Sequence, residues 1–479
     1  MSFRHLTRFQ LIVCLALLSI LIRFTVFKTY YVFSNDDLYY FDWVNVLLGN
    51  GGFNLIDSPL FPPGYPIVLT LENWIAGSPY FVKMFEQVIL MTAIPVLVLM
   101  VLERIAPKVD FIFIFVIFTA PFMFIGMSTI NISSEIWYTI IVLAGLINVL
   151  GFDEYNLFRR LLYSSILFSF AYLIRPEALV YFASWIFALR LWLAKYHQNL
   201  QSVGKKFLLL LMPPALAVLS LSIFLTNYYG QVTLTGKFKS NYEFSKEISE
   251  NTLARVLENS IGLLRVLIAP MFFGPAIVLL AVIGFFILLQ RRTKLDNKAL
   301  IVFTPSILVI IVLLTLYPMG RPLIPSVASI VILSYYGWER IKLILPSRTI
   351  LLQRFILATV LIAQTLFPYF GNQLSDSTRG YYEAISSIKT DSSLIVYSRE
   401  TTLELLNGQF QYCSASVSCQ DTPDYLLLSK STRAKLEVMN EIEVSGVFPE
   451  SVTAYGAEYR RVAVSKGPYH KVYSYKLVN

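Results

Sequence analysis

Carboxylate, guanidinium and ammonium groups recur at the ends of long apolar runs in this sequence. Charged groups at a membrane boundary are expensive and tend to mark functional sites. A carboxylate there can accept the proton of a hydroxyl group, and an arginine can hold a phosphate through two parallel hydrogen bonds. Together they suit the activation of a hydroxyl beside a bound phosphate. The residues of this kind are Asp36, Asp37, Glu135, Arg175, Glu177, Lys237 and Arg321.

The apolar runs between these residues predict that lipid is the solvent of the chain. Of the 479 residues, 56% are hydrophobic and only 14% are charged. Soluble domains usually carry about 25% charged residues. A soluble protein with this composition would have to expose large apolar patches. The length therefore suits a bundle of spans of roughly 20 residues each, with one additional domain.

The separation of the runs predicts a mainly α fold, a polytopic bundle of about eleven transmembrane helices. Each span must be helical because hydrocarbon offers backbone groups no hydrogen-bond partner. The first run is expected to be a retained anchor, since it is long and no small-residue cleavage site follows it. The expected spans lie near residues 9–28, 81–102, 110–127, 135–152, 160–174, 177–194, 207–227, 268–290, 299–317, 322–339 and 350–370.

Basic residues predict the orientation of these spans. With the N-terminus in the cytosol, Lys and Arg outnumber acidic residues over the inner segments taken together, whereas the outer loops mix both signs. This bias is the positive-inside rule. The net charge of +9 therefore indicates topology. It does not indicate nucleic-acid binding, because the cations lie in separate membrane-flanking clusters. We expect an integral protein of the bacterial inner membrane.

Two large outer loops interrupt the predicted bundle, which extends over residues 1–370. They are residues 29–80 and 228–265. Within the first loop, residues 38–48 are amphipathic and aromatic, as in a helix that lies in the membrane interface. Phe61-Pro-Pro-Gly-Tyr-Pro66 then predicts a rigid turn that leads into another apolar helix. A loop of about fifty residues is more often a functional element than a connector.

The C-terminal segment, residues 371–479, differs sharply in composition and predicts a small soluble α/β domain outside the cytoplasm. Alternating apolar residues in 393–397 and 424–428 predict strands. Segments near 379–389 and 431–442 are expected to be helical.

The cysteines and histidines limit the disulfides and metal sites that are expected. Cys413 and Cys419 lie six positions apart in the outer domain, where an oxidising compartment favours their pairing, although two free thiols remain an alternative. No spacing resembles a zinc site, and there are only three histidines. Asp36, Asp37 or Glu135 could hold a divalent ion, but no spacing requires one.

An ordered set of short motifs resembles a known superfamily. The motifs resemble those of the GT-C integral-membrane glycosyltransferases, and among them the protein O-mannosyltransferase and lipid A aminoarabinose transferase group. The resemblance covers about residues 9–340 in order. One departure is Pro322, which stands where the late motif usually carries an aromatic residue. The matching elements are Asp36, Tyr40, Leu47-Leu48, Gly51-Gly52, Pro62-Pro-Gly-Tyr-Pro66, Ser134-Glu135, Arg175-Pro-Glu177 and Arg321 to Pro325.

This resemblance implies a hexosyl or pentosyl transferase that uses a polyprenyl-phosphate sugar at the outer membrane face. The acceptor would be a hydroxyl of a lipid, a polysaccharide or a protein. By match to the motif, Asp36 is implied as the catalytic base and Asp37 as the fallback. The further implied residues are Glu135 for catalysis, Arg175, Arg321 and Lys237 for the phosphate, and Glu177, Tyr40 and Tyr65 for the substrates.

Plain structural interpretations of the same residues stay open. Acidic residues favour helix starts, so Asp36 and Asp37 could simply solvate one. Glu135 could cap a helix, and Arg175 with Glu177 could pair at adjacent helix ends.

Two other functions also stay open: a transporter or flippase for a lipid-linked substrate, and a non-catalytic membrane scaffold. A transporter normally has ionisable residues near the midplane and two matching halves. The middles of these spans are nearly free of charge, and the halves do not match. A scaffold leaves the acidic first loop unexplained.

Overall fold

The structure, a computed structural model, describes a little over half of the sequence, and all structural statements below concern those residues. They form two compact units, a helical unit and a sheet unit, which are described separately. The described residues are 7–30, 40–41, 43–45, 47–49, 62–106, 109–119, 134–151, 157–195, 200–229, 252–268, 275–290, 297–315, 321–344, 384, 388, 394–397, 411–413, 421–428, 448–464 and 472–478.

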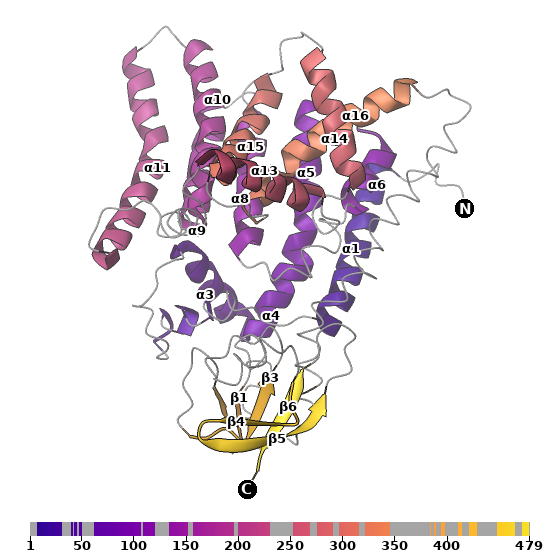
Figure 1. The fold of residues 1–479 in the computed structure, drawn as a ribbon. Coiled ribbons are helices and arrows are strands. Elements are labelled where there is room, and N and C mark those ends of the chain that lie inside the picture. The colour runs from indigo at the N-terminus through magenta and orange to yellow at the C-terminus, as the bar shows by residue number, and fades with distance from the viewer. Residues whose placement is uncertain are drawn as a thin grey trace. The chain divides into compact units, whose positions relative to one another are not determined.

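The helical unit is built from long apolar helices with several short helical segments between them (Figure 1). Described residues between 40 and 47 are helical as well, as expected for the first outer loop. The helical elements are α1 (Arg8–Tyr30), α3 (Gly64–Ala76), α4 (Pro79–Met84), η3 (Phe85–Leu90), α5 (Met91–Ile105), α6 (Phe111–Thr119), α8 (Ser134–Val149), α9 (Leu157–Ile174), η5 (Pro176–Tyr181), α10 (Phe182–Lys195), α11 (Leu200–Tyr229), α13 (Thr252–Ile268), α14 (Pro275–Gln290), α15 (Asn297–Thr315), η6 (Arg321–Ser326) and α16 (Val327–Ile344).

Helices occur in each predicted span up to residue 339, while the span predicted at 350–370 lies outside the described residues. Three described helices are long and apolar enough to cross a membrane: Pro79–Ile105, Leu157–Ile174 and Gly204–Asn227. Shorter apolar helices cover Arg8–Leu21, Ser134–Val149, Ile277–Leu288 and Lys298–Leu314. The mainly helical fold is confirmed, and the number of spans stays a prediction.

The second outer loop contains a helix that the sequence analysis does not predict. Residues 228–265 are expected to form a loop, but α13 occupies 252–268. Its apolar residues recur at helical spacing, with Leu257, Ile261 and Leu264 exposed along one side. This amphipathic pattern lacks the long continuous apolar run that marks a span, so a search for spans misses it.

Small and hydroxylated residues bring neighbouring helices close together. The side chain of Ser165 on α9 donates a hydrogen bond to the carbonyl of Leu210 on α11 (2.7 Å). Where α14 crosses α16, Gly284 and Gly337 face each other's helix, and a Cβ at either position would collide with a backbone carbonyl of the other helix. Close backbone approach and hydroxyl hydrogen bonds are the usual means of packing helices in lipid.

Ion pairs join residues that are predicted to lie on the inner side of the membrane. Arg8 pairs with Glu103, which joins the start of α1 to the end of α5. Lys342 on α16 contacts Asp110 at 2.8 Å and Glu339 at 2.5 Å. All five residues belong to the predicted inner segments, so their contacts agree with the predicted grouping of the loops.

The sheet unit contains a mixed sheet of six described strands in the order β2-β1-β3-β6-β5-β4. Strand β1 pairs in parallel with both β2 and β3, and the remaining pairs are antiparallel. A two-residue turn of Tyr455 (φ 53°) and Gly456 (φ 72°) joins β4 to β5. Two left-handed residues are what a tight hairpin requires. The strands are β1 (Ile395–Tyr397), β2 (Gln411–Cys413), β3 (Tyr425–Leu428), β4 (Ser451–Ala454), β5 (Ala457–Val464) and β6 (Tyr473–Leu477).

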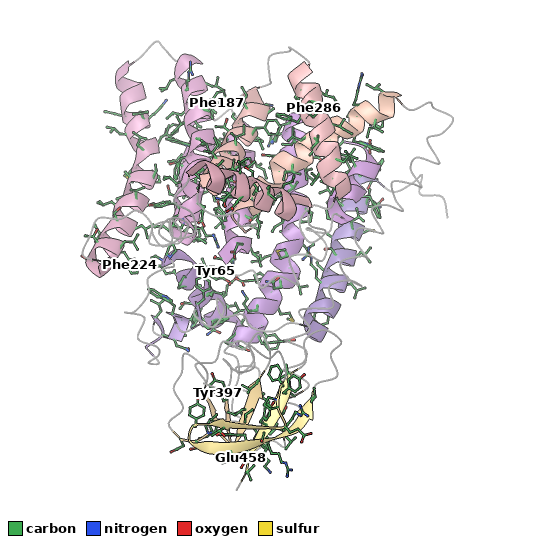
Figure 2. All side chains as sticks on the ribbon, in the orientation of Figure 1. Tyr65, Phe187, Phe224, Phe286, Tyr397 and Glu458 are labelled. Atoms are coloured by element: carbon green, nitrogen blue, oxygen red, sulfur yellow. The ribbon has the colours of Figure 1, made fainter. Side chains whose placement is uncertain are left out.

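Both faces of this sheet are covered, as expected for an α/β arrangement. Tyr397, labelled in Figure 2, packs on one face with Leu426, while Val396 and Leu427 pack on the other. Side chains alternate between faces along a strand, so both faces receive apolar residues. The two predicted strands are confirmed as β1 and β3.

The other predictions for the C-terminal segment are largely untested. In the segment 379–389 only Ala384 and Ile388 are described, and Ala384 is helical. The predicted helix at 431–442 lies outside the described residues.

Candidate active site

A buried arginine at the end of α9 joins two carboxylates. Nη1 of Arg175 donates hydrogen bonds to Oε1 of Glu135 (2.6 Å) and to Oγ of Ser134 (3.0 Å). Nη2 donates to Oε1 of Glu177 (3.1 Å). The side chains of Arg175 and Glu135 are 7% and 1% exposed, whereas that of Glu177 is 28% exposed. Glu177 is therefore the member of this cluster most accessible to a ligand.

The local sequence explains why these groups meet. Ser134 and Glu135 form the first turn of α8, where the helix dipole favours a carboxylate. Arg175 has an extended backbone (φ −146°, ψ 121°) because it precedes Pro176, and a residue before proline avoids the helical region. The chain therefore breaks between α9 and η5, and Arg175 and Glu177 lie on either side of that break.

The charges of this cluster do not cancel. One guanidinium faces two carboxylates, which gives a net charge of about −1 when all three are ionised. Burial by itself lowers the pKa of Arg175, but the carboxylates of Glu135 and Glu177 outweigh that effect and keep the pKa above its ordinary value. The Nε atom of Arg175 is buried and has no hydrogen-bond partner among the described residues. One donor of this arginine is thus left for a ligand.

Two tyrosines of the first outer loop extend the cluster. The hydroxyl of Tyr40 donates to Oγ of Ser134 (3.2 Å), and its ring packs edge-on against Tyr65 at 4.5 Å between centroids. The hydroxyl of Tyr65, which Figure 2 labels, contacts both carboxylate oxygens of Glu86 at 2.8 and 2.9 Å. Lys83 donates to Glu86 at 2.6 Å and to Tyr65 at 3.1 Å. The polar network therefore runs from α3 and α4 to α8 and α9.

A second carboxyl group lies next to Glu86. Oε1 of Glu72 on α3 accepts a hydrogen bond from Nε1 of Trp137 (3.0 Å). Burial, with the nearby charge of Glu86 as the next cause, raises the pKa of Glu72 to about 8. Glu72 thus holds a proton at neutral pH, and the site contains a carboxylic acid as well as carboxylates.

The structure brings together four of the residues predicted for the site. Arg175, Glu135 and Glu177 are in direct contact, and Tyr40 is linked to them through Ser134. Tyr65 contacts the ring of Tyr40 but makes its hydrogen bonds to the Lys83–Glu86 pair.

The remaining predicted residues are only partly described. Asp36, Asp37, Lys237 and Cys419 lie outside the described residues. Of Arg321 and Cys413 only the backbone is described: Arg321 begins η6, and Cys413 ends β2.

The backbone of η6 nevertheless lies close to the cluster. The hydroxyls of Tyr181 on η5 and Ser326 on η6 are 3.4 Å apart, and η6 packs against α8. The segment that carries Arg321 is therefore a neighbour of the segment that carries Arg175. Among the described residues, no group of three or more His, Cys, Asp and Glu side chains is arranged to hold a metal ion.

Lys83, Glu86 and Glu72 belong to this polar network but were not predicted from the sequence. The signal was present, since Lys83 and Glu86 are opposite charges three positions apart in an otherwise apolar helix. In the structure Glu86 also lies in the π-helical segment η3, which interrupts the α-helix between Pro79 and Ile105. Such segments occur frequently at functional sites.

Comparison with known proteins gives structural likenesses but no sequence match. No protein-family model matches the chain, and no curated protein matches it. The fold is similar to that in the crystal structure of ArnT from Cupriavidus metallidurans bound to undecaprenyl phosphate. The TM-score is 0.55 at 10% identity, over 98% of this chain and 98% of that one. The chain therefore has the fold of that ArnT structure, and at the level of the fold this confirms the resemblance that its motifs show.

Proposed function

We propose that this protein transfers a sugar from a polyprenyl-phosphate-linked donor to a hydroxyl group of an acceptor. The observation that carries the proposal is the buried Glu135–Arg175–Glu177 cluster within an ArnT-like fold. The similar ArnT structure contains undecaprenyl phosphate, which supports a lipid of the same class as the carrier here. The acceptor is proposed to be a lipid, a polysaccharide or a protein.

The proposed reaction is a displacement at the anomeric carbon. The acceptor oxygen forms a bond to that carbon, and the bond between the carbon and the phosphate oxygen breaks. The lipid phosphate leaves with the electron pair, and a carboxylate of the site takes the proton of the acceptor hydroxyl. We assign this proton transfer to Asp36, with Asp37 as the fallback, and the orientation of the acceptor to Glu177 and Glu135.

Arginine and tyrosine complete the proposed site. Arg175 fixes both carboxylates, and its unpartnered Nε is the donor that a phosphate oxygen could reach. Arg321 and Lys237 are further proposed phosphate ligands, and Tyr40 and Tyr65 line the substrate side. Guanidinium groups suit a departing phosphate because their donors match two oxygens at once.

We further propose an inner-membrane location with the site outside the cytoplasm. In this arrangement the N-terminus and the Arg8–Glu103 end of the helices face the cytosol. Residues 1–370 form the catalytic bundle, and residues 371–479 form an extracytoplasmic domain. The positive-inside bias of the loops supports this orientation.

Substitution of the assigned carboxylates tests the proposal. Asp36→Asn is expected to lower sugar transfer at least about 100-fold, the usual contribution of a positioned base. Glu177→Gln is expected to lower it by about 100-fold as well, because a misplaced acceptor costs about that much. Glu258 is exposed on α13 and provides the matched control Glu258→Gln. The purified variants are assayed for release of polyprenyl phosphate, with and without EDTA to test for a divalent ion. Activity within about threefold of the control in both variants would overturn the assignment.

A flippase for the lipid-linked sugar is the second candidate, and buried charges favour it. Arg23, Lys83 and Glu86 are buried within predicted spans, and each lies away from the middle of its span, toward one end. Buried intramembrane charges often mark transport paths. Vesicles that contain the protein and a labelled donor separate the two functions, because a transferase consumes the donor and a flippase moves it intact.

A further inference from the structure

One buried arginine of the helical unit has no acidic partner among the described residues. Arg23 on α1 is 1% exposed. Its Nε donates to Oγ of Ser19 (3.2 Å), one turn earlier on the same helix. Neither Nη1 nor Nη2 has a hydrogen-bond partner within the described part of the chain. A buried guanidinium without an anionic partner is strongly unfavourable, so we expect an anion to bind at Arg23.

The side of α1 that carries Arg23 faces protein. Leu15, Ser19 and Arg23 are spaced four residues apart, and all three are buried. Leu17 and Leu21, on another side of the helix, are exposed, as expected for contact with lipid tails. Arginines that only snorkel keep the guanidinium in the interface. Arg23 instead points into the helical unit.

The position of Arg23 along α1 places it near the level of the polar network. Arg8 and Glu103 pair at one end of α1 and α5. Measured along the helix axes from that pair, Arg23 is about 22 Å away, and so is the last part of the π-helical segment η3. The segment η3 contains Glu86, which bonds to Lys83 and Tyr65.

The charge balance distinguishes Arg23 from the other buried cations. The described helical unit contains three of them, Arg23, Lys83 and Arg175. Lys83 pairs with Glu86, and Arg175 pairs with two carboxylates. Among the described residues, Arg23 alone keeps both terminal NH2 groups, Nη1 and Nη2, without an acceptor. Parallel donors of this kind match two oxygens of one phosphate group.

We propose that Arg23 binds the phosphate group of a lipid that reaches the buried side of α1. On the basis of the proposed function, this lipid is the polyprenyl phosphate carrier. In this assignment Arg23 is a phosphate contact in addition to those proposed at Arg175, Arg321 and Lys237, while Glu177 and Glu135 orient the acceptor. A phosphate on an ordinary membrane lipid or free in solution offers the same chemistry, so the test includes both.

Binding to the full-length protein in detergent tests the proposal without any need for sugar transfer. The probes are undecaprenyl phosphate, phosphatidylglycerol and inorganic phosphate, measured by native mass spectrometry or by competition. Arg23→Met is expected to weaken undecaprenyl phosphate binding at least about tenfold, with partial recovery in Arg23→Lys. Arg159 is exposed on α9, and Arg159→Met is the matched control, expected to bind as the unchanged protein does.

Thermal unfolding provides the second measurement. Because Arg23 is an unpaired buried charge, Arg23→Met is expected to be at least as stable as the unchanged protein when no lipid is bound. The variant should also lose the stabilisation that undecaprenyl phosphate gives. Lower stability without lipid, together with unchanged lipid affinity, would mean that Arg23 pairs with an acid of the chain, and would overturn the proposal.

The outcomes separate this inference from the proposed function. Equal effects on phosphatidylglycerol and undecaprenyl phosphate, or displacement of the lipid by inorganic phosphate, would overturn the assignment to the carrier. Arg23-dependent binding without any consumption of donor would support the site and contradict the transferase. If Arg23→Met kept full transfer activity and lipid affinity, the proposed phosphate site at Arg23 would be wrong, while the proposed transferase function would still stand.

Discussion

Removal of the guanidinium of Arg175 should destabilise the helical unit strongly. Arg175→Met removes the 2.6 Å bond to Glu135, the 3.0 Å bond to Ser134 and the 3.1 Å bond to Glu177. The side chain of Glu135 is only 1% exposed, so its carboxylate would remain buried and lose the guanidinium that faces it. Methionine fills a similar volume, so the lost charge rather than a cavity dominates the effect.

The magnitude follows from the burial of the pair. Breaking a buried ion pair by removing one partner destabilises a protein by about 3–5 kcal/mol. That corresponds to roughly two to four powers of ten in the unfolding equilibrium. Glu177 contributes less because its side chain is 28% exposed and water can solvate it. A second substitution, Glu135→Gln, removes the orphaned charge and should restore part of the stability.

Reversible unfolding of the purified protein in mixed micelles measures these changes. The unchanged protein, the two single variants and the double variant form a mutant cycle, and the expected coupling energy is about 2 kcal/mol or more. Arg159→Met changes an exposed arginine of α9, the helix that ends just before Arg175, and should stay within about 0.5 kcal/mol. If Arg175→Met behaved like this control and the cycle were additive, the account of the cluster would be wrong.

The remaining predictions concern a titrating carboxyl group and a helix crossing. Folded Glu72 keeps its proton up to about pH 8, while the unfolded chain releases it near 4.5, so stability should fall as the pH rises through this window. Glu72→Gln should reduce that slope in a series of thermal unfolding measurements, and an unchanged slope would contradict the assignment. Gly284→Ala should destabilise the protein by about 1–3 kcal/mol because the added Cβ meets a carbonyl of α16. Gly204→Ala, which meets open space in α11, should be neutral or stabilising by up to about 1 kcal/mol, and equal effects of the two would refute the close crossing.

Helix positions were predictable because membrane helices require long apolar runs. The runs near 81–102 and 207–227 correspond to parts of α4 to α5 and of α11. Two features of the helical unit were not predicted, because neither is marked by a long apolar run. The helix α13 is amphipathic, and the pattern of apolar residues does not reveal the π-helical segment η3. The close approach of Gly284 to α16 depends on which helices are neighbours, which a single sequence does not give.

The candidate site was predictable where a motif placed charges at helix ends. Glu135 and Arg175 are forty positions apart, yet both follow or precede a helix boundary on the same predicted side, and they are in contact. Lys83 and Glu86 were not predicted because they lie inside a predicted span, which was identified from its apolar residues alone. Arg23 was missed for the same reason. Whether a buried charge has a partner depends on tertiary packing, so the sequence alone could not reveal its state.

The most direct test of the central claim is to follow the fate of the donor. The purified protein is incubated with a panel of polyprenyl-phosphate sugars and a crude acceptor fraction, and the lipid products are identified by mass spectrometry. The account predicts that one donor is converted to free polyprenyl phosphate, with its sugar recovered on a hydroxyl of the acceptor. Recovery of every donor intact, or movement of a donor across the membrane with its sugar still attached, would contradict it.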